Sequence, residues 1–155
     1  MTGTGATVLT ALAAVGSGTV GGVFFAFDSF VLRGLARLPE GHGADAMRSI
    51  NVTAVRPAFM TALFGTAALA VGVAVIGARS PETVERVLLV GGGGAYLAGT
   101  VLTTIVRNVP LNDALESRQG ATWARFLTAW GGANRVRTAA ALVASAAFTS
   151  ALARS

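Results

Sequence analysis

The chain has 155 residues, of which 53% are hydrophobic and only 12% are charged, about half the charged share of an ordinary soluble domain. A small domain with so few charges cannot cover its surface with polar groups, which argues against a soluble monomer and favours a lipid bilayer as the solvent. The net charge of +5 comes from twelve arginines scattered among apolar segments. This distribution is typical of residues that flank membrane spans, so we expect no nucleic-acid partner.

Four apolar stretches are long enough to cross a hydrocarbon core of about 30 Å. They predict membrane-spanning helices over about residues 6–32, 57–78, 87–106 and 124–153, the last with Arg135 and Arg137 on its first turns in the membrane. The stretches are continuous rather than alternating, which disfavours a β-barrel. The sequence therefore predicts an all-α fold, a bundle of four transmembrane helices that forms a single integral membrane domain over residues 1–155.

The arginines also predict an orientation. Nine of the twelve fall in the first and third connections or in the first turns of the fourth span, which places those connections in the cytoplasm and both termini outside, in a cell inner membrane. Twenty glycines and many alanines predict helices that pack closely through small residues, and the same faces could join copies of the chain as a homo-oligomer.

The first span ends at Asp28, which follows Phe27 in a run of phenylalanines. A charged residue inside a membrane is costly, and less so near the interface. We interpret Asp28 either as an interfacial acid that reaches water or a loop arginine, or as a catalytic or ligand-binding carboxylate beside an aromatic wall.

The third span ends at Asn108, Pro110, Asn112 and Asp113. Proline removes a backbone donor and disfavours helical geometry in the residue before it. A helix broken at the membrane edge exposes carbonyl groups, which neighbouring polar groups or a cavity must satisfy. The pattern predicts either a helix stop followed by a cap or a polar recess lined by these side chains.

A stripe of side chains leads into the fourth span. Trp123, Trp130, Asn134 and Arg137 are spaced so that they share one helical face. Two tryptophans at a membrane boundary are typical of an aromatic belt. A tryptophan wall that ends in an amide and a guanidinium also suits a flat aromatic ligand with a polar edge. Asn51, just before the second span, is either a turn residue or part of the same lining.

Metal and cofactor chemistry has few residues to use. The chain has no cysteine and one histidine, His42, which excludes a disulfide framework, a thiolate site and a multi-histidine metal site within one chain. We expect no metal and no cofactor. His42 is interpreted as a solvated loop residue, and the alternative is a general base or a lone ligand to haem or a metal.

These features together resemble the anthrone oxygenase-like family of small four-helix membrane proteins. The resemblance runs along nearly the whole chain. The segments that carry it are Phe24-Phe25-Ala-Phe27 with Ser29-Phe30-Val31, Ile50-Asn51 with Pro57-Ala-Phe59, Asn108-Val-Pro110-Leu-Asn112, and Trp130-x-x-x-Asn134-x-x-Arg137.

The resemblance implies insertion of oxygen at the activated carbon of an anthrone, which gives an anthraquinone. An anthrone can lose a proton to form a delocalised carbanion that reacts with dioxygen without a metal. The protein then needs a base, a cationic group and a dry aromatic slot.

In that reaction Arg137, with Asn134 or Asn112, would stabilise the oxyanion, and Asp113 or Asp28 would take the proton. Trp130, Trp123 and Phe27 would sandwich the rings. The alternative of a different class is a non-catalytic membrane module that binds a lipid, a quinone or another apolar small molecule, or a partner subunit.

Overall fold

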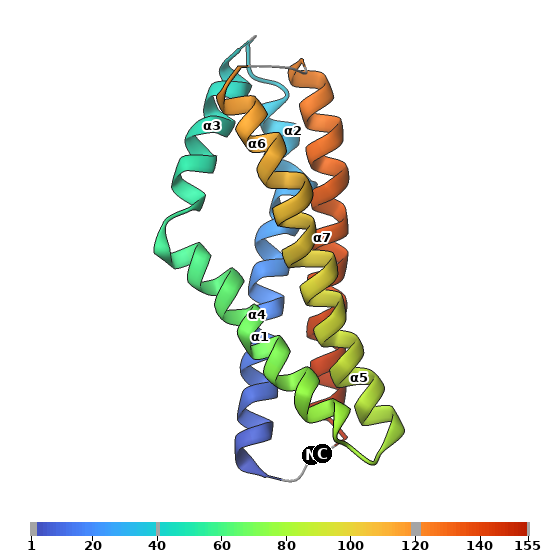
Figure 1. Ribbon diagram of the computed structural model, residues 1–155. Coiled ribbons are helices and arrows are strands. Elements are labelled where there is room, and N and C mark those ends of the chain that lie inside the picture. The colour runs from blue at the N-terminus through green and yellow to red at the C-terminus, as the bar shows by residue number, and fades with distance from the viewer. Residues whose placement is uncertain (1–2, 40, 119–121, 155) are drawn as a thin grey trace.

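The computed structural model describes residues 3–39, 41–118 and 122–154. All regular secondary structure in these ranges is helical, which confirms the all-α prediction (Figure 1). Several elements run on from one another with helical backbone, so the described chain contains five continuous helical segments. They are α1 (Thr4–Ala26), η1 (Phe27–Val31) and α2 (Leu32–Leu35); α3 (His42–Ala54); α4 (Pro57–Ala78); α5 (Thr83–Gly94), η2 (Ala95–Leu102), η3 (Thr104–Asn108) and α6 (Val109–Glu116); and α7 (Trp123–Leu152).

The predicted number of helices is therefore too low by one. The additional helix, α3, lies in the connection between the first and second spans, and His42 is its first residue rather than a loop residue. Residues 42–54 can form this helix because Ala44 and Met47 are three positions apart and share a buried face. The predicted second span coincides with α4, where Pro57 occupies the first turn, a position at which a missing N–H costs nothing.

The helix does not break at Pro110, although both interpretations of this stretch assumed that it stops or breaks there. It continues from Thr83 to Glu116 as a single segment, with Pro110 in the first turn of α6. The preceding segments η2 and η3 have the wider π-helical hydrogen-bonding pattern. A local change from the α to the π pattern lets the chain continue past a residue that cannot donate, because the i to i−4 ladder is already interrupted there.

Three of the segments are long and apolar enough to cross a membrane: Thr4–Leu35, Pro57–Ala78 and Thr83–Glu116. The fourth predicted span coincides with α7, but α7 is not among these three. Its first half carries Arg125, Arg135 and Arg137, and its uncharged part begins only at Thr138.

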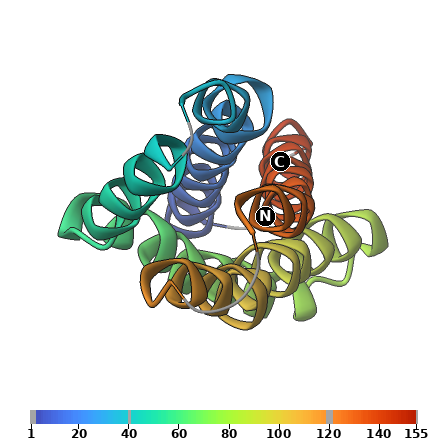
Figure 2. The same cartoon turned by 90° about the horizontal axis from the view of Figure 1, so that it is seen from above.

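The four long segments pack in a ring. α1 contacts α7 and α4, and the segment with α5 and η2 closes the ring between α4 and α7 (Figure 2). The two ends of the chain lie together at one end of the bundle, and α3 packs against α2 and α6 at the other (Figure 1). α3 and α4 meet at an elbow that leans away from α7.

Candidate functional site

A cavity of about 540 Å³ lies inside this elbow, a volume typical of small-molecule sites. All four long segments and α3 contribute to its wall. The wall is mostly apolar, with aromatic side chains that include Phe24, Phe27, Phe59 and Trp130. The polar side chains that line it are Ser49, Asn51, Thr53, Thr104, Asn112 and Arg137. None of the described lining residues is acidic, so Arg137 is the charged group of the cavity.

Arg137 is held in a fixed position on this wall. Its side chain is only 4% exposed, and its guanidinium carbon lies 4.1 Å from the centre of the Phe24 ring and 4.9 Å from that of Trp130. One terminal nitrogen donates to Asn134 Oδ1 at 2.7 Å and the other to Thr104 Oγ1 at 3.3 Å. The buried Nε has no partner among the described residues. A buried donor without a partner leaves one hydrogen bond of the guanidinium unmet, which costs free energy.

Asp28 lies behind Asn134 and does not line the cavity. The amide nitrogen of Asn134 donates to Asp28 Oδ1 at 2.7 Å and to the carbonyl oxygen of Phe24 at 2.8 Å, and Thr138 donates to Asp28 Oδ2 at 2.5 Å. The amide of Asn134 therefore connects the carboxylate to the guanidinium. Its nitrogen faces Asp28 and its oxygen faces Arg137. This chain of bonds supplies a nearby negative charge to Arg137 and keeps the carboxylate out of the cavity.

Trp130 is fixed in a similar way. Its indole N–H donates to Asn112 Oδ1 at 2.8 Å, and Asn108 Nδ2 donates to the carbonyl oxygen of Trp130 at 3.4 Å. The ring of Phe27 lies 5.4 Å from that of Trp130. The two asparagines thus join the segment around Pro110 to α7, and the Oδ1 atom of buried Asn108 is left without a partner in the described chain.

The ten predicted site residues fall into three groups. Five line the cavity, namely Phe27, Asn51, Asn112, Trp130 and Arg137. Three lie behind this lining and hold it in place, namely Asp28, Asn108 and Asn134. Asp113 and Trp123 do not take part in this arrangement, since Asp113 is exposed on α6 and Trp123 stacks on Phe126 further along α7.

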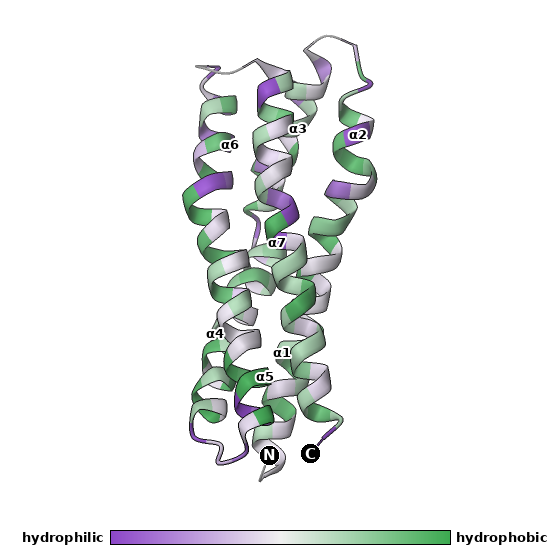
Figure 3. Ribbon diagram, turned by 90° about the vertical axis from the view of Figure 1, so that its right-hand side faces the viewer, coloured by the Kyte–Doolittle hydropathy of each residue, from purple (hydrophilic) through white to green (hydrophobic). Residues whose placement is uncertain are grey.

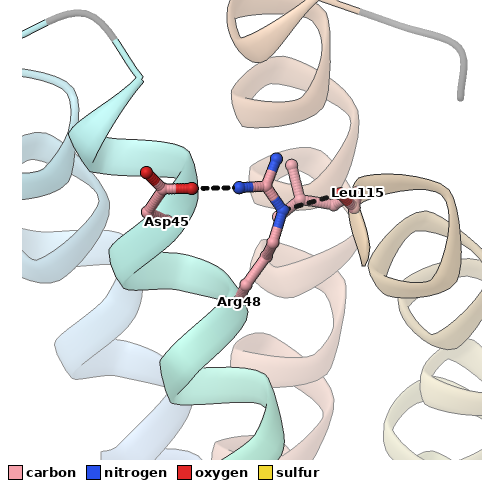
Figure 4. A network of polar contacts seen from close by, with 3 residues as sticks. All are labelled: Asp45, Arg48 and Leu115. Carbon is pink, nitrogen blue, oxygen red and sulfur yellow. Dashed lines mark hydrogen bonds and ion pairs between the residues drawn. The ribbon is translucent and has the colours of Figure 1, made fainter. Parts of the chain in front are cut away.

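Trp123 lines a separate, smaller cavity of about 340 Å³ at the end of the bundle that carries α3 and α6. Asp45 and Arg48 form an ion pair there, and Arg48 Nε donates to the carbonyl oxygen of Leu115 at 2.9 Å (Figure 4). These contacts tie α3 to the last turn of α6. His42, also on α3, is exposed, and no group of three histidine, aspartate or glutamate residues that could hold a metal ion is found in the described chain.

Two threonines of the site were missed by the sequence reasoning. Thr104 lies on the cavity wall against Arg137, and Thr138 completes the partners of Asp28. A signal for Thr104 exists, because Thr100, Thr104, Asn108 and Asn112 recur every four residues and so follow one face of the helix. Thr138 carries the same signal, because Trp130, Asn134 and Thr138 also recur every four residues along α7.

Residues 52–147, more than half of the chain, match the anthrone oxygenase family. The chain belongs to this family. The part that matches the anthrone oxygenases includes Asn112, Trp130, Asn134 and Arg137, whereas Asp28 lies outside it. No curated protein and no solved structure matches the chain.

Proposed function

We propose that this protein binds a flat aromatic molecule of the anthrone type in the cavity and oxidises it with dioxygen to the quinone. The observation that carries the proposal is the position of Arg137, a buried guanidinium between two aromatic rings with an unpartnered Nε and no acidic residue on the described cavity wall. Such a wall suits a flat ring system, and such a cation suits an oxygen atom that gains negative charge.

In the proposed reaction the ketone oxygen of the substrate lies against Arg137. Loss of a proton from the activated carbon spreads negative charge onto that oxygen, and the guanidinium stabilises the resulting enolate more strongly than the neutral ketone. The carbon then forms a bond to dioxygen, the peroxide anion takes a proton back from water, and loss of water from the hydroperoxide gives the second carbonyl group. One molecule of dioxygen is consumed, and one each of quinone and water is formed.

The carboxylates proposed from the sequence as the base do not line the cavity, so we assign no base to Asp28 or Asp113. The protein acts by lowering the pKa of the substrate, and the proton leaves to water or to the membrane interface through the cavity mouth. Asp28 and Asn134 act through Arg137: they orient its guanidinium and offset the cost of burying its charge.

Arg137→Ala in purified protein, with oxygen uptake and quinone absorbance measured on anthrone, tests the proposal. We expect the rate to fall about 100-fold or more, the usual effect of removing a donor to a developing oxyanion. Arg135→Ala is the matched control, because Arg135 is exposed two residues away on the same helix and should keep the wild-type rate.

Two outcomes would count against the proposal. An Arg137→Ala protein that melts as the wild type does and still turns over at its rate would remove Arg137 from the reaction. Wild-type protein that binds an anthraquinone but takes up no oxygen with anthrone would favour a non-catalytic membrane module that binds a quinone or a lipid.

We also propose that the protein lies in a cell inner membrane with both termini outside. The support is the excess of arginine in the connections at the end of the bundle that carries α3 and α6, since arginine-rich connections stay in the cytoplasm. A protease-sensitive tag at either terminus should be cleaved from the outer side of intact spheroplasts.

A further inference from the structure

The long segments differ in how well they fit a membrane. α4 has 22 residues and the segments Thr4–Leu35 and Thr83–Glu116 have 32 and 34, while α7 has 30. At 1.5 Å per residue α4 is about 33 Å long and the others are about 45–50 Å, whereas the hydrocarbon core is about 30 Å thick. Only α4 matches the core, and the three longer segments extend well beyond it.

Exposed arginines mark the same length on three of the segments. Each pair brackets an apolar stretch, and the separations are 23, 21 and 19 residues along the chain, or about 34, 32 and 29 Å of helix. The pairs are Arg56 with Arg79, which flank α4, Arg86 with Arg107 on the segment from α5 to η3, and Arg135 with Arg154 on and just after α7.

One arginine of each pair, namely Arg56, Arg107 or Arg135, lies at about the same height in the bundle. Thr100 donates to the carbonyl oxygen of Arg137 and Asn108 to that of Trp130, so Arg107 and Arg135, which lie between these contacts, are within about one helical turn of each other. The ring of Phe59 lies 5.9 Å from that of Phe24, which is itself against Arg137. Arg56 is therefore within about one helical turn of the same level.

The proportion of alanine in the core falls across this level. Towards the chain termini the core is rich in alanine, and Gly92 and Gly93 lie so close to α7 and α4 that a methyl group there would meet them at about 2.8 to 2.9 Å. Such close small-residue packing is typical of helices in lipid. Beyond the level, α3, α6 and α7 pack mainly through larger side chains, including Met47, Leu115 and Phe126, and Gly43 of α3 also lies close to the carbonyl oxygen of Leu35.

The distribution of polar residues follows the same division. Hydrophilic residues gather over the half with α2, α3 and α6 and again at the tip between α4 and α5, with an apolar band between them (Figure 3). Arg137 is two residues from Arg135 and is joined to Asp28 through Asn134, so these polar contacts lie near the same arginine level. A charged network is far less costly there than at the centre of a bilayer.

We propose that the bilayer covers only the part of the bundle between the two arginine levels, and that the cavity opens sideways into the lipid headgroup layer. In this arrangement α2, α3, α6 and the first half of α7 stand in the headgroup layer and the water beyond it. Five exposed apolar residues line the cavity, namely Val23, Val55, Phe64, Ile105 and Val109. We assign the mouth to Val55, Ile105 and Val109, because each is one or two positions from Arg56 or Arg107, at the level where the headgroups lie.

This position defines the class of ligand, a point that rests on the proposed function. The ligand is a flat amphiphile that is dissolved in the membrane and reaches the cavity from the interface. Its apolar rings pass between Phe59 and Trp130, and its oxygen meets Arg137 at the level of the headgroups. Such a ligand does not have to leave the lipid to bind.

The position in the membrane is tested with single cysteines on α7, because the chain has no cysteine of its own. Thr128, Val136 and Val143 are exposed and lie about 12 and 10 Å apart along the helix. Each Xaa→Cys variant of the full chain is spin-labelled and placed in vesicles of phosphatidylcholine and phosphatidylglycerol. Collision with oxygen is then compared with collision with a water-soluble nickel complex.

We expect the label at position 128 to meet the nickel complex, the label at 143 to meet oxygen, and the label at 136 to lie between them. If the labels at positions 128 and 143 both report hydrocarbon, the bilayer covers the whole bundle and the proposal is wrong. This outcome leaves oxygen uptake untouched, so it is distinguishable from failure of the proposed function.

The mouth is tested with Val109→Cys and a charged thiol reagent added to the same vesicles. We expect this cysteine to react, and a saturating anthraquinone to slow the reaction at least several-fold, while a cysteine at position 128 reacts at the same rate with and without it. A cysteine at 109 that is as unreactive as one at 143, or that gains no protection from anthraquinone, would overturn the proposed mouth.

Discussion

Replacing Asn134 with leucine would test whether the site depends on the hydrogen bonds that join α1 to α7. Leucine has nearly the shape of asparagine, so the change removes the bonds with little change in volume. The amide makes three, to Phe24 O, to Asp28 Oδ1 and from Arg137, all between 2.7 and 2.8 Å. Thr138 would still bond to Asp28, but one terminal nitrogen of the buried guanidinium would lose its acceptor.

The size of the effect follows from these contacts. A hydrogen bond between helices in a membrane contributes about 0.6 to 1.7 kcal/mol, and one to a charged group about 1.5 to 3 kcal/mol. Two of the three bonds involve a charged partner, so these ranges together predict that Asn134→Leu lowers the free energy of unfolding by about 4 to 8 kcal/mol. The Arg137 side chain should also lose its fixed orientation, because the Asn134 amide is its shortest contact.

The measurement is unfolding in mixed micelles of rising dodecyl sulfate content, followed by tryptophan fluorescence, since Trp130 lies against the same guanidinium. Asn51→Leu is the control: Asn51 is a half-buried amide on the cavity wall and makes no side-chain hydrogen bond in the described structure. Its substitution should change the free energy by less than about 1 kcal/mol. An Asn134→Leu protein within about 1 kcal/mol of the wild type would refute the inference that this amide holds the site together.

Two further substitutions test the packing at the two ends of the bundle. A Cβ atom at Gly99 would overlap an alanine Cβ of α7, so Gly99→Ala should destabilise the protein by about 1 to 3 kcal/mol. Gly94 faces open space, so the control Gly94→Ala should be neutral or slightly stabilising. Equal melting temperatures for the two variants would contradict the close packing. Arg48→Met removes the bond to the carbonyl oxygen of Leu115 and should cost about 1 kcal/mol. It should also speed proteolysis in α3 while leaving the rest of the bundle protected, and unchanged proteolysis would show that α3 is held by its apolar face alone.

Much of the local structure could be predicted from the sequence because it depends on neighbours along the chain. The bounds of α4 follow from an uncharged stretch that begins at a proline and ends before Arg79. The face shared by Trp130, Asn134 and Arg137 follows from helical spacing alone, and it points inward as expected. By contrast, α3 was missed because it is short and only weakly apolar, so a search for long apolar stretches passes over it.

The sequence by itself determined that the chain is helical, where its apolar stretches lie and which helical faces carry polar groups, because composition and a period of 3.6 residues carry that information. Only the tertiary structure decided which of these groups meet. Asn134 and Asp28 are 106 residues apart in the chain, and nothing in the spacing says that an amide, rather than the carboxylate, faces Arg137. Which group faces Arg137 depends on how α1, η3 and α7 pack against one another. Arg137 and Asn134 come from α7 and Asp28 from the first segment, and these elements are adjacent only in the folded bundle.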